Sequence, residues 1–182
     1  MSKKSKRKTK EQPRNEIGDL IPPRPSYCLY CGVKLTVTTR HNKARLVCPN
    51  GDFVYRDNPV PVAVLLIPTD DDGVVLIRRK DDPRFLWLPG GYVDKGEHPE
   101  QAAIREAVEE TALHVEIDRL LGIEVPEDEN VVALFYLCKP VTSKPIAHDD
   151  ALDARVYYRA DAGSIDCIYT KHYVDQFFAE KE

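Results

Sequence analysis

Three glutamates, Glu106, Glu109 and Glu110, fall within one short stretch of the chain. In a helix this i, i+3, i+4 spacing places three carboxylates on one face, because each residue advances by about 100°. Two carboxylates about 5 Å apart repel each other by roughly 3 kcal/mol at an effective dielectric constant of about 20. Such a face is either a solvated acidic surface or a cation site, and ligands that are all oxygen suit Mg²⁺ or Mn²⁺ rather than zinc.

The sequence around the glutamates predicts a helix that is anchored at its start. Gly90-Gly91 favours a turn that other residues would strain. His98-Pro99 is typical of a helix start, with proline at the first helical position and Gln101 two residues later. We expect the opposite face of the helix to pack on the core through Ile104, Val108, Thr111 and Ala112.

The stretch 90–113 reads GGYVDKGEHPEQAAIREAVEETAL. It resembles the Nudix box, the loop–helix–loop signature of the Nudix hydrolases. The glycine, the four glutamates and the arginine of that signature stand at the family's spacing, as Gly91, Glu97, Arg105, Glu106, Glu109 and Glu110. One position departs from the pattern, because Ala112 stands where the family usually has a glycine that ends the helix in the left-handed conformation.

The resemblance implies hydrolysis of a nucleoside diphosphate linked to another group X, with attack at phosphorus and release of a nucleotide monophosphate. It implies that Glu106, Glu109 and Glu110 bind Mg²⁺ or Mn²⁺, together with the Gly90 carbonyl. Arg105 and Glu97 are expected to form a pair that orients the helix and its ligands.

The remaining roles are also expectations from the resemblance. Arg79 and Gly91 are expected to contact the substrate. For the general base we prefer Glu106, with Asp150 in a late loop as the second choice. A nucleotide such as ADP-ribose, NADH or a nucleotide sugar is the expected small-molecule substrate. The alternative is a non-catalytic sensor that binds a nucleotide or RNA, and the complete set of box carboxylates favours an enzyme.

Composition limits the other possibilities. The hydrophobic fraction is 42% and the charged fraction 31%, as in ordinary globular proteins, and no apolar run is long enough to span a membrane. Residues 1–14 carry seven Lys/Arg and one acid, a net charge of +6. Because the whole chain has a net charge of −4, the remaining residues carry −10. We therefore expect residues 1–25 to be a disordered basic tail and nucleic acid to be an improbable partner. A homodimer is left open.

Five cysteines, an odd number with one CxxC pair, favour a reducing, cytoplasmic location and metal binding over disulfides. Residues 26–57 resemble the zinc ribbon that precedes the catalytic domain in some Nudix proteins, including the NADH pyrophosphatase group. Cys28, Cys31 and Cys48 are present, but Gly51 stands where a fourth cysteine belongs. Either His41 or Asp52 supplies a fourth Zn²⁺ ligand, or the ribbon is degenerate and holds no metal.

The resemblance implies an α/β fold over residues 58–182, a Nudix α/β/α sandwich with a mixed sheet. Apolar runs predict strands at Val60–Ile67 and Val74–Ile77 around a hairpin turn, Asp70–Gly73, and a third buried strand at Val131–Cys138. Weaker patterns predict strands at His114–Ile123 and Ala154–Arg159. A closing helix is predicted at Tyr169–Glu180, with an apolar stripe of Val174 and Phe177 or Phe178, and Trp87 is expected in the core.

Overall fold

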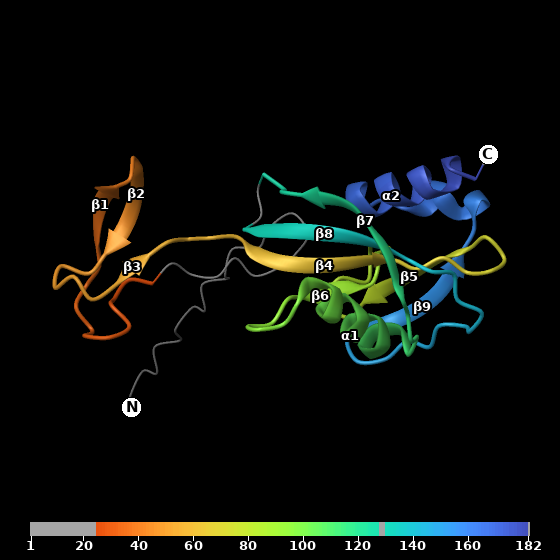
Figure 1. Ribbon diagram of the computed structural model, residues 1–182, viewed down its shortest axis with the longest axis horizontal. Helices are drawn as coiled ribbons and strands as arrows, with labels where there is room; N and C mark the ends of the chain where they lie inside the picture. Colours follow the sequence, from red (N-terminus) through yellow and green to blue (C-terminus); the bar gives the residue numbers. More distant parts are fainter. Residues whose placement is uncertain (1–24, 128–129, 182) are drawn as a thin grey trace, which may run out of the picture. The chain divides into compact units, whose positions relative to one another are not determined.

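A computed structural model describes residues 25–127 and 130–181 (Figure 1). It divides the chain into two compact units, with the boundary between Asn58 and Pro59. Apart from Pro25, the expected basic tail lies outside the described residues. In the described part of the chain, no helix has the length and apolar character needed to cross a membrane.

The N-terminal unit is a small antiparallel sheet. Its strands lie in the order β1 (Thr36–Arg40), β2 (Lys43–Val47) and β3 (Val54–Tyr55). Its core is equally small, with Cys28, Leu35 and Cys48 buried and Leu46 and Phe53 packed against them. A cluster of this size offers little hydrophobic stabilisation, so a unit of this kind commonly depends on a metal ion or another cross-link.

The C-terminal unit is built on a four-stranded mixed sheet. Its strand order is β6 (Gly90–Tyr92), β4 (Val60–Leu66), β8 (Val131–Cys138) and β7 (Ile117–Glu124). The central pair, β4 and β8, is parallel, and the outer pairs are antiparallel. A second, two-stranded antiparallel sheet pairs β5 (Val74–Arg79) with β9 (Ala151–Tyr157).

Two helices cover opposite faces of the central strands, α1 (Pro99–Thr111) and α2 (Ile168–Ala179), with a short 3₁₀ helix η1 (Arg159–Ser164) before the second (Figure 1). Successive residues of β4 enter different cores: Leu65 packs in the cluster with α1, and Leu66 packs in the cluster with α2. Burial on both faces explains why β4 and β8 are continuously apolar rather than alternating. The arrangement confirms the expected α/β fold with a mixed sheet between helices.

Several strands begin and end at residues other than those predicted from the sequence. The weakly patterned strand begins at Ile117 rather than His114, and the last strand spans Ala151–Tyr157 rather than Ala154–Arg159. The turn at 70–73 closes through a bond from the Thr69 N–H to the Gly73 carbonyl at 2.9 Å, but β5 continues away from β4 and pairs with β9. Val174, Phe177 and Phe178 of α2 are all buried, as predicted.

Candidate active site

Helix α1 begins and ends as its sequence indicates. His98 caps the start, Pro99 is the first helical residue, and the His98 N–H donates to Gln101 Oε1 at 3.2 Å. The helix ends at Ala112, which adopts the left-handed conformation with φ 55° and donates its N–H to the Val108 carbonyl at 3.0 Å. The alanine therefore reproduces the exit that a glycine would make, at a conformational cost of about 1–2 kcal/mol.

The buried face of α1 differs from the prediction. Ile104 is 38% exposed, Ala112 is exposed and Val108 is only partly buried, so of the four expected core residues only Thr111 is fully enclosed. Three alanines pack instead, Ala102, Ala103 and Ala107. Because alanine is small, the helix lies close to β4 and β6, and that proximity brings its glutamates to Gly90 and Gly91 of β6.

Gly90 and Gly91 lie in strand β6, paired with Val64 and Ala63 of β4, rather than in the turn that the sequence predicted. They leave room for the carboxylates and for the neighbouring strand. A Cβ on Gly91 would lie 2.5 Å from Glu106 Cδ, and a Cβ on Gly90 would lie 2.8 Å from Val64 Cα. The Gly90 N–H donates to Glu110 Oε2 at 2.8 Å. A side chain at position 90 would collide with the β4 backbone, whereas a side chain at position 91 would displace the Glu106 carboxylate. Glycine at both positions therefore allows the close approach of β6 to β4 and α1.

Arg105 connects the other carboxylates. Its Nε and Nη2 donate to the two oxygens of Glu97 at 3.0 and 3.1 Å. Its Nη1 donates to Glu106 Oε1 at 2.7 Å and to Glu109 Oε2 at 2.9 Å. Nη2 also donates to the Tyr92 carbonyl at 3.0 Å. All five guanidinium N–H groups can thus be used in bonds that fix the loop before the helix against the helix itself.

These contacts and burial move the carboxyl pKa values in opposite directions. The Arg105 guanidinium, helped by the Asp94 N–H, lowers the pKa of Glu97. Burial raises the pKa of Glu106 although Arg105 opposes the shift. Burial raises the pKa of Glu110 to about 8, since this side chain is only 2% exposed and the Gly90 N–H compensates in part.

A late loop adds a fifth acid to this region. The Ile146 N–H donates to the Thr111 carbonyl at 2.9 Å, and the His148 N–H donates to the Glu110 carbonyl at 3.2 Å. Asp150 follows, and its negative charge contributes to the raised pKa of both Glu106 and Glu110. Asp150 is therefore brought to the glutamates by backbone contacts between the loop and the helix.

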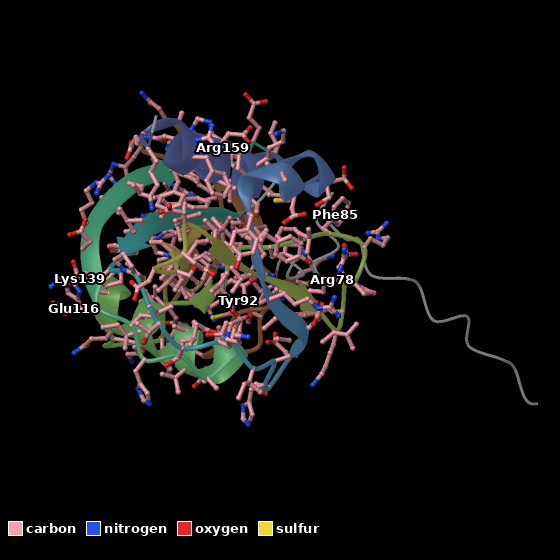
Figure 2. All side chains as sticks on the ribbon, turned by 90° about the vertical axis from the view of Figure 1, so that its right-hand side faces the viewer. Arg78, Phe85, Tyr92, Glu116, Lys139 and Arg159 are labelled. Carbon is pink, nitrogen blue, oxygen red and sulfur yellow. The ribbon has the colours of Figure 1, made fainter. Side chains whose placement is uncertain are left out.

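The two arginines at the end of β5 point to different partners. The positive charge of Arg79 acts on Glu110, and its guanidinium also pairs with Asp81 at 3.2 Å. Arg78 instead donates from Nη1 to the Pro83 carbonyl at 2.9 Å, and Figure 2 shows it near Phe85, at the edge opposite Lys139 and Glu116. Of the two, Arg79 is the one beside the carboxylates.

Comparison with known proteins identifies the family to which the chain belongs. A family model described as NUDIX domain matches residues 59–168, which is more than half of the chain. The chain belongs to the NUDIX domain family. The matched region contains the whole constellation described above, from Arg79 through the α1 glutamates to Asp150.

Two relatives and one solved structure illustrate the likeness. An ADP-ribose pyrophosphatase of Methanocaldococcus jannaschii is 34% identical over 102 residues, 53% of this chain and 60% of that protein. A putative 8-oxo-dGTP diphosphatase of Bacillus subtilis is 37% identical over 76 residues, 41% of this chain and 50% of that protein. The chain thus spans about half the length of these curated relatives. A Nudix hydrolase from Nitrosomonas europaea shares the fold with a TM-score of 0.74 at 20% identity, over 84% of this chain and 92% of that one.

The donor set of the Nudix domain fits a hard divalent cation. Glu106, Glu109 and Glu110 offer only oxygen atoms, and Gly91 places no side-chain carbon beside Glu106. In this structure the three carboxylates are not gathered on one point. Arg105 lies between Glu106 and Glu109, and Glu110 turns toward Gly90.

The cysteines of the N-terminal unit do converge. The Sγ atoms of Cys28, Cys31 and Cys48 all lie within 4.8 Å of one another, the single such group of three potential ligands among residues 25–127 and 130–181. Cys31 Sγ and Cys48 Sγ are 3.4 Å apart, and Asp52 Oδ2 lies 3.9 Å from Cys48 Sγ. Of the two expected fourth ligands, Asp52 is beside the thiols, whereas His41 lies in the turn between β1 and β2.

Sequence reasoning missed the contacts that involve backbone atoms. The Tyr92 carbonyl, the Asp94 N–H bonded to Glu97 at 3.0 Å, and the loop around His148 all support the carboxylates. The sequence does not indicate these contacts, because every residue type carries the same backbone groups.

Trp87, which was expected in the core, is only partly buried. Its Nε1 is the one buried side-chain N or O atom without a hydrogen-bond partner in the described part of the chain.

Proposed function

We propose that this protein hydrolyses the diphosphate bond of a nucleoside diphosphate linked to a group X and releases a nucleotide monophosphate. The observation that carries the proposal is the cluster of acids around Gly90 and Gly91 of β6, with Arg105 bonded to three of the four box glutamates. A diphosphate is anionic, so these acids would repel it without a divalent cation between them. The proposal therefore includes Mg²⁺ or Mn²⁺.

In this proposal Glu106, Glu109 and Glu110 bind the cation, and the Gly90 carbonyl joins them. A bound cation neutralises charge on the phosphoryl oxygens and acidifies a water molecule. Arg105 and Glu97 act as positioning residues, since they fix the orientation of two of the ligands. Arg79 is suited to a substrate phosphate because its positive charge acts on the buried Glu110. Gly91 stays a proposed substrate contact.

For the general base, Glu106 is the first choice and Asp150 the second. Glu106 is preferred because its carboxylate lies beside Gly91 and is held by Arg105 at 2.7 Å, within the group of proposed ligands. Asp150 is near enough for its charge to act on Glu106 and Glu110. An Asp150→Asn variant separates the two: if Asp150 is the base, its kcat falls about as far as that of Glu106→Gln.

For the substrate we propose ADP-ribose, NADH or a nucleotide sugar. The name of the archaeal relative supports ADP-ribose, and that of the Bacillus relative extends the range to nucleoside triphosphates. The test is a panel of NADH, ADP-ribose, diadenosine polyphosphates and nucleoside triphosphates with Mg²⁺, in which release of a monophosphate is measured. Tight binding of one compound without turnover of any would favour a nucleotide sensor instead.

The ligand assignment has its own test. Glu109→Gln should lower kcat on the order of a hundredfold or more while the protein stays folded. Glu116→Gln is the matched control, because Glu116 is also an ion-paired glutamate, with Lys139 at 2.6 Å, but it lies outside the box, between α1 and β7, at the edge away from Arg78 (Figure 2). Equal activity of the two variants would show that Glu109 is misassigned.

We also propose that the N-terminal unit binds Zn²⁺ through Cys28, Cys31, Cys48 and Asp52. Three neighbouring thiols and an adjacent carboxylate supply the four ligands of a structural zinc site. Protein purified under reducing conditions should contain one zinc per chain, and Asp52→Ala should weaken its retention against a chelator. His41→Ala should retain zinc normally. A zinc content near zero in the parent protein would exclude the site.

A further inference from the structure

The last turn of α1 is capped by a loop that is distant in the sequence. The final four carbonyls of an α-helix have no N–H partner within the helix, and in α1 these are the carbonyls of residues 108–111. The Val108 carbonyl accepts from the Ala112 N–H at 3.0 Å. The other three carbonyls accept bonds from residues 146–148 of the late loop, and the last turn contains no basic side chain that could serve instead.

His148 provides two of these three bonds. Its N–H donates to the Glu110 carbonyl at 3.2 Å, and its Nδ1 lies 3.3 Å from the Glu109 carbonyl oxygen. A carbonyl oxygen only accepts, so Nδ1 carries the proton in this contact. The third bond runs from the Ile146 N–H to the Thr111 carbonyl at 2.9 Å. Of the three donors, only the imidazole depends on the residue type, because the other two are backbone groups.

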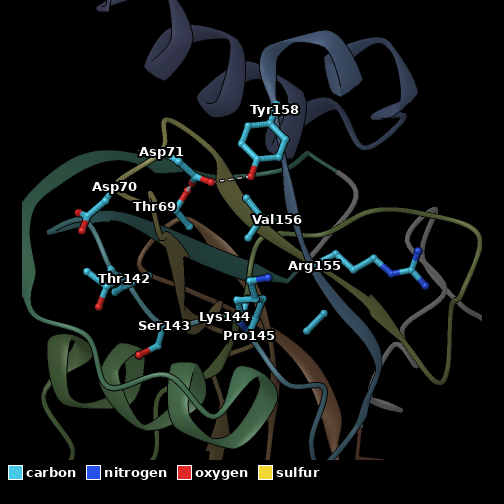
Figure 3. Close-up of a pocket in the computed structure, with 12 residues that line it drawn as sticks. Thr69, Asp70, Asp71, Thr142, Ser143, Lys144, Pro145, Arg155, Val156 and Tyr158 are labelled. Atoms are coloured by element: carbon cyan, nitrogen blue, oxygen red, sulfur yellow. Dashed lines mark hydrogen bonds between the residues drawn. The ribbon is translucent and has the colours of Figure 1, made fainter.

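Little apolar packing holds the late loop in place. None of residues 141–150 is fully buried, and Ile146 is 66% exposed. The first part of the loop, residues 141–145, borders a cavity of about 590 Å³ that is also lined by the turn at 69–71 and the end of β9 (Figure 3). Because the loop borders open space rather than the core, the hydrogen bonds of residues 146–150 largely decide where it lies.

A closed turn connects His148 to Asp150. The Ala151 N–H donates to the His148 carbonyl at 3.0 Å and closes four residues into a turn, within which Asp149 adopts the left-handed conformation with φ 47°. Lys80, just after β5, donates from its N–H to the Asp150 carbonyl at 2.9 Å and from its Nζ to the Asp149 carbonyl. The residue that caps α1 and the late acid therefore belong to one hydrogen-bonded turn.

We propose that His148 is a positioning residue for the metal site, because its imidazole joins the last turn of α1, which carries Glu109 and Glu110, to the turn that carries Asp150. The inference rests on the proposed function and goes beyond it, since it assigns a role to a side chain outside the box. Without the imidazole bond, the end of the helix loses one contact with the loop, and the two glutamates are held less firmly. Metal affinity then falls although every proposed ligand is still present.

The test measures Mn²⁺ affinity in the absence of substrate, by electron paramagnetic resonance. His148→Ala should raise the dissociation constant for Mn²⁺ about fivefold, the effect of losing one typical net hydrogen bond. The Mg²⁺ concentration that gives half-maximal turnover should rise by a similar factor, and kcat at saturating Mg²⁺ should change less. His148→Phe keeps a ring without a donor and should behave like His148→Ala. His148→Asn places an amide N–H near the position of Nδ1 and should restore most of the affinity.

His114→Ala is the matched control, because His114 is also an exposed histidine close to the end of α1. It should leave Mn²⁺ affinity unchanged. Unchanged Mn²⁺ affinity in His148→Ala would overturn the proposal, even with a lower melting temperature, because the bond would then only stabilise the fold. Normal affinity in His148→Phe would also overturn it, as would equal affinities of His148→Asn and His148→Ala. The Mn²⁺ measurements need no turnover, so the hydrolase proposal is judged separately, by the substrate panel.

Discussion

Gly91 and Glu106 face each other so closely that a side chain at position 91 would displace the Glu106 carboxylate. A Cβ there would lie 2.5 Å from Glu106 Cδ and within 2.8 Å of both carboxylate oxygens. Gly91 belongs to β6, whose partner is β4, so the backbone has little freedom to retreat. The identity of residue 91 therefore sets the position of a proposed metal ligand 15 positions later in the chain.

Gly91→Ala should consequently lower kcat about a hundredfold, as expected for a reacting group displaced by around 1 Å, with a parallel loss of Mn²⁺ affinity. Steady-state kinetics and a Mn²⁺ titration followed by electron paramagnetic resonance would measure both effects. Gly163→Ala is the matched control, because nothing lies within 4 Å of a Cβ at that position. Normal Mn²⁺ affinity in Gly91→Ala would show that Glu106 does not depend on this space.

Arg105→Lys should reduce activity by about 10- to 100-fold although the charge is kept. A lysine ammonium has three donors and cannot hold Glu97 through two parallel bonds while also reaching Glu106 and Glu109. Metal affinity and kcat should both fall, and the melting temperature should change less. Arg119→Lys, in an exposed pair with Asp118 and Glu180, should be neutral in both measurements. Equal kinetics for the two variants would show that Arg105 contributes no more than an ordinary surface ion pair.

We expect the buried Glu110 to make the metal-free protein less stable as the pH rises toward 8. Its pKa rises from 4.5 to about 8 on folding, so between these values the folded state binds more protons than the unfolded state. The linkage slope is then negative, and stability falls as pH rises from about 4.5 to 8. Thermal melts in a chelator should show this decline, and Glu110→Gln should flatten it. An unchanged slope in the variant would assign the decline to another group.

Mg²⁺ should offset the same effect. A cation that binds the ionised form of Glu110 stabilises the protein more at pH 8 than at pH 6, because less proton release is needed. The shift in melting temperature on adding Mg²⁺ should therefore grow with pH in the parent protein. It should lose most of that pH dependence in Glu110→Gln. A shift of the same size at both pH values would contradict the assignment of Glu110 as a ligand.

Ala112→Gly should stabilise the protein by about 1 kcal/mol. Ala112 holds φ at 55°, where alanine is strained and glycine is not. Ala179→Gly is the matched control, since it lies in the ordinary helical conformation at the end of α2 and should be destabilised by up to about 1 kcal/mol. Urea unfolding measures both. Destabilisation of Ala112→Gly as large as that of the control would mean that the left-handed exit carries no strain.

Local sequence was sufficient where local interactions decide the structure. His98-Pro99 predicted the start of α1 because capping involves only neighbouring residues. The apolar runs at 60–67 and 131–138 predicted β4 and β8 because burial on both faces leaves a continuous signal. Ile104 was assigned to the core incorrectly, because hydrophobicity alone does not reveal that three alanines allow a closer and more favourable approach.

The sequence by itself determined the kind of chemistry: four glutamates, an arginine and a glycine at fixed spacing identify the box, and the intervals between cysteines identify the second cluster. Only the tertiary structure decided which groups meet. It joined Arg105 to three glutamates, buried Glu110 against Gly90, brought Asp150 to the same acids, and set Asp52 rather than His41 beside the thiols. The physical reason is that these contacts depend on packing distances and on backbone groups common to every residue, which leave no pattern in the sequence.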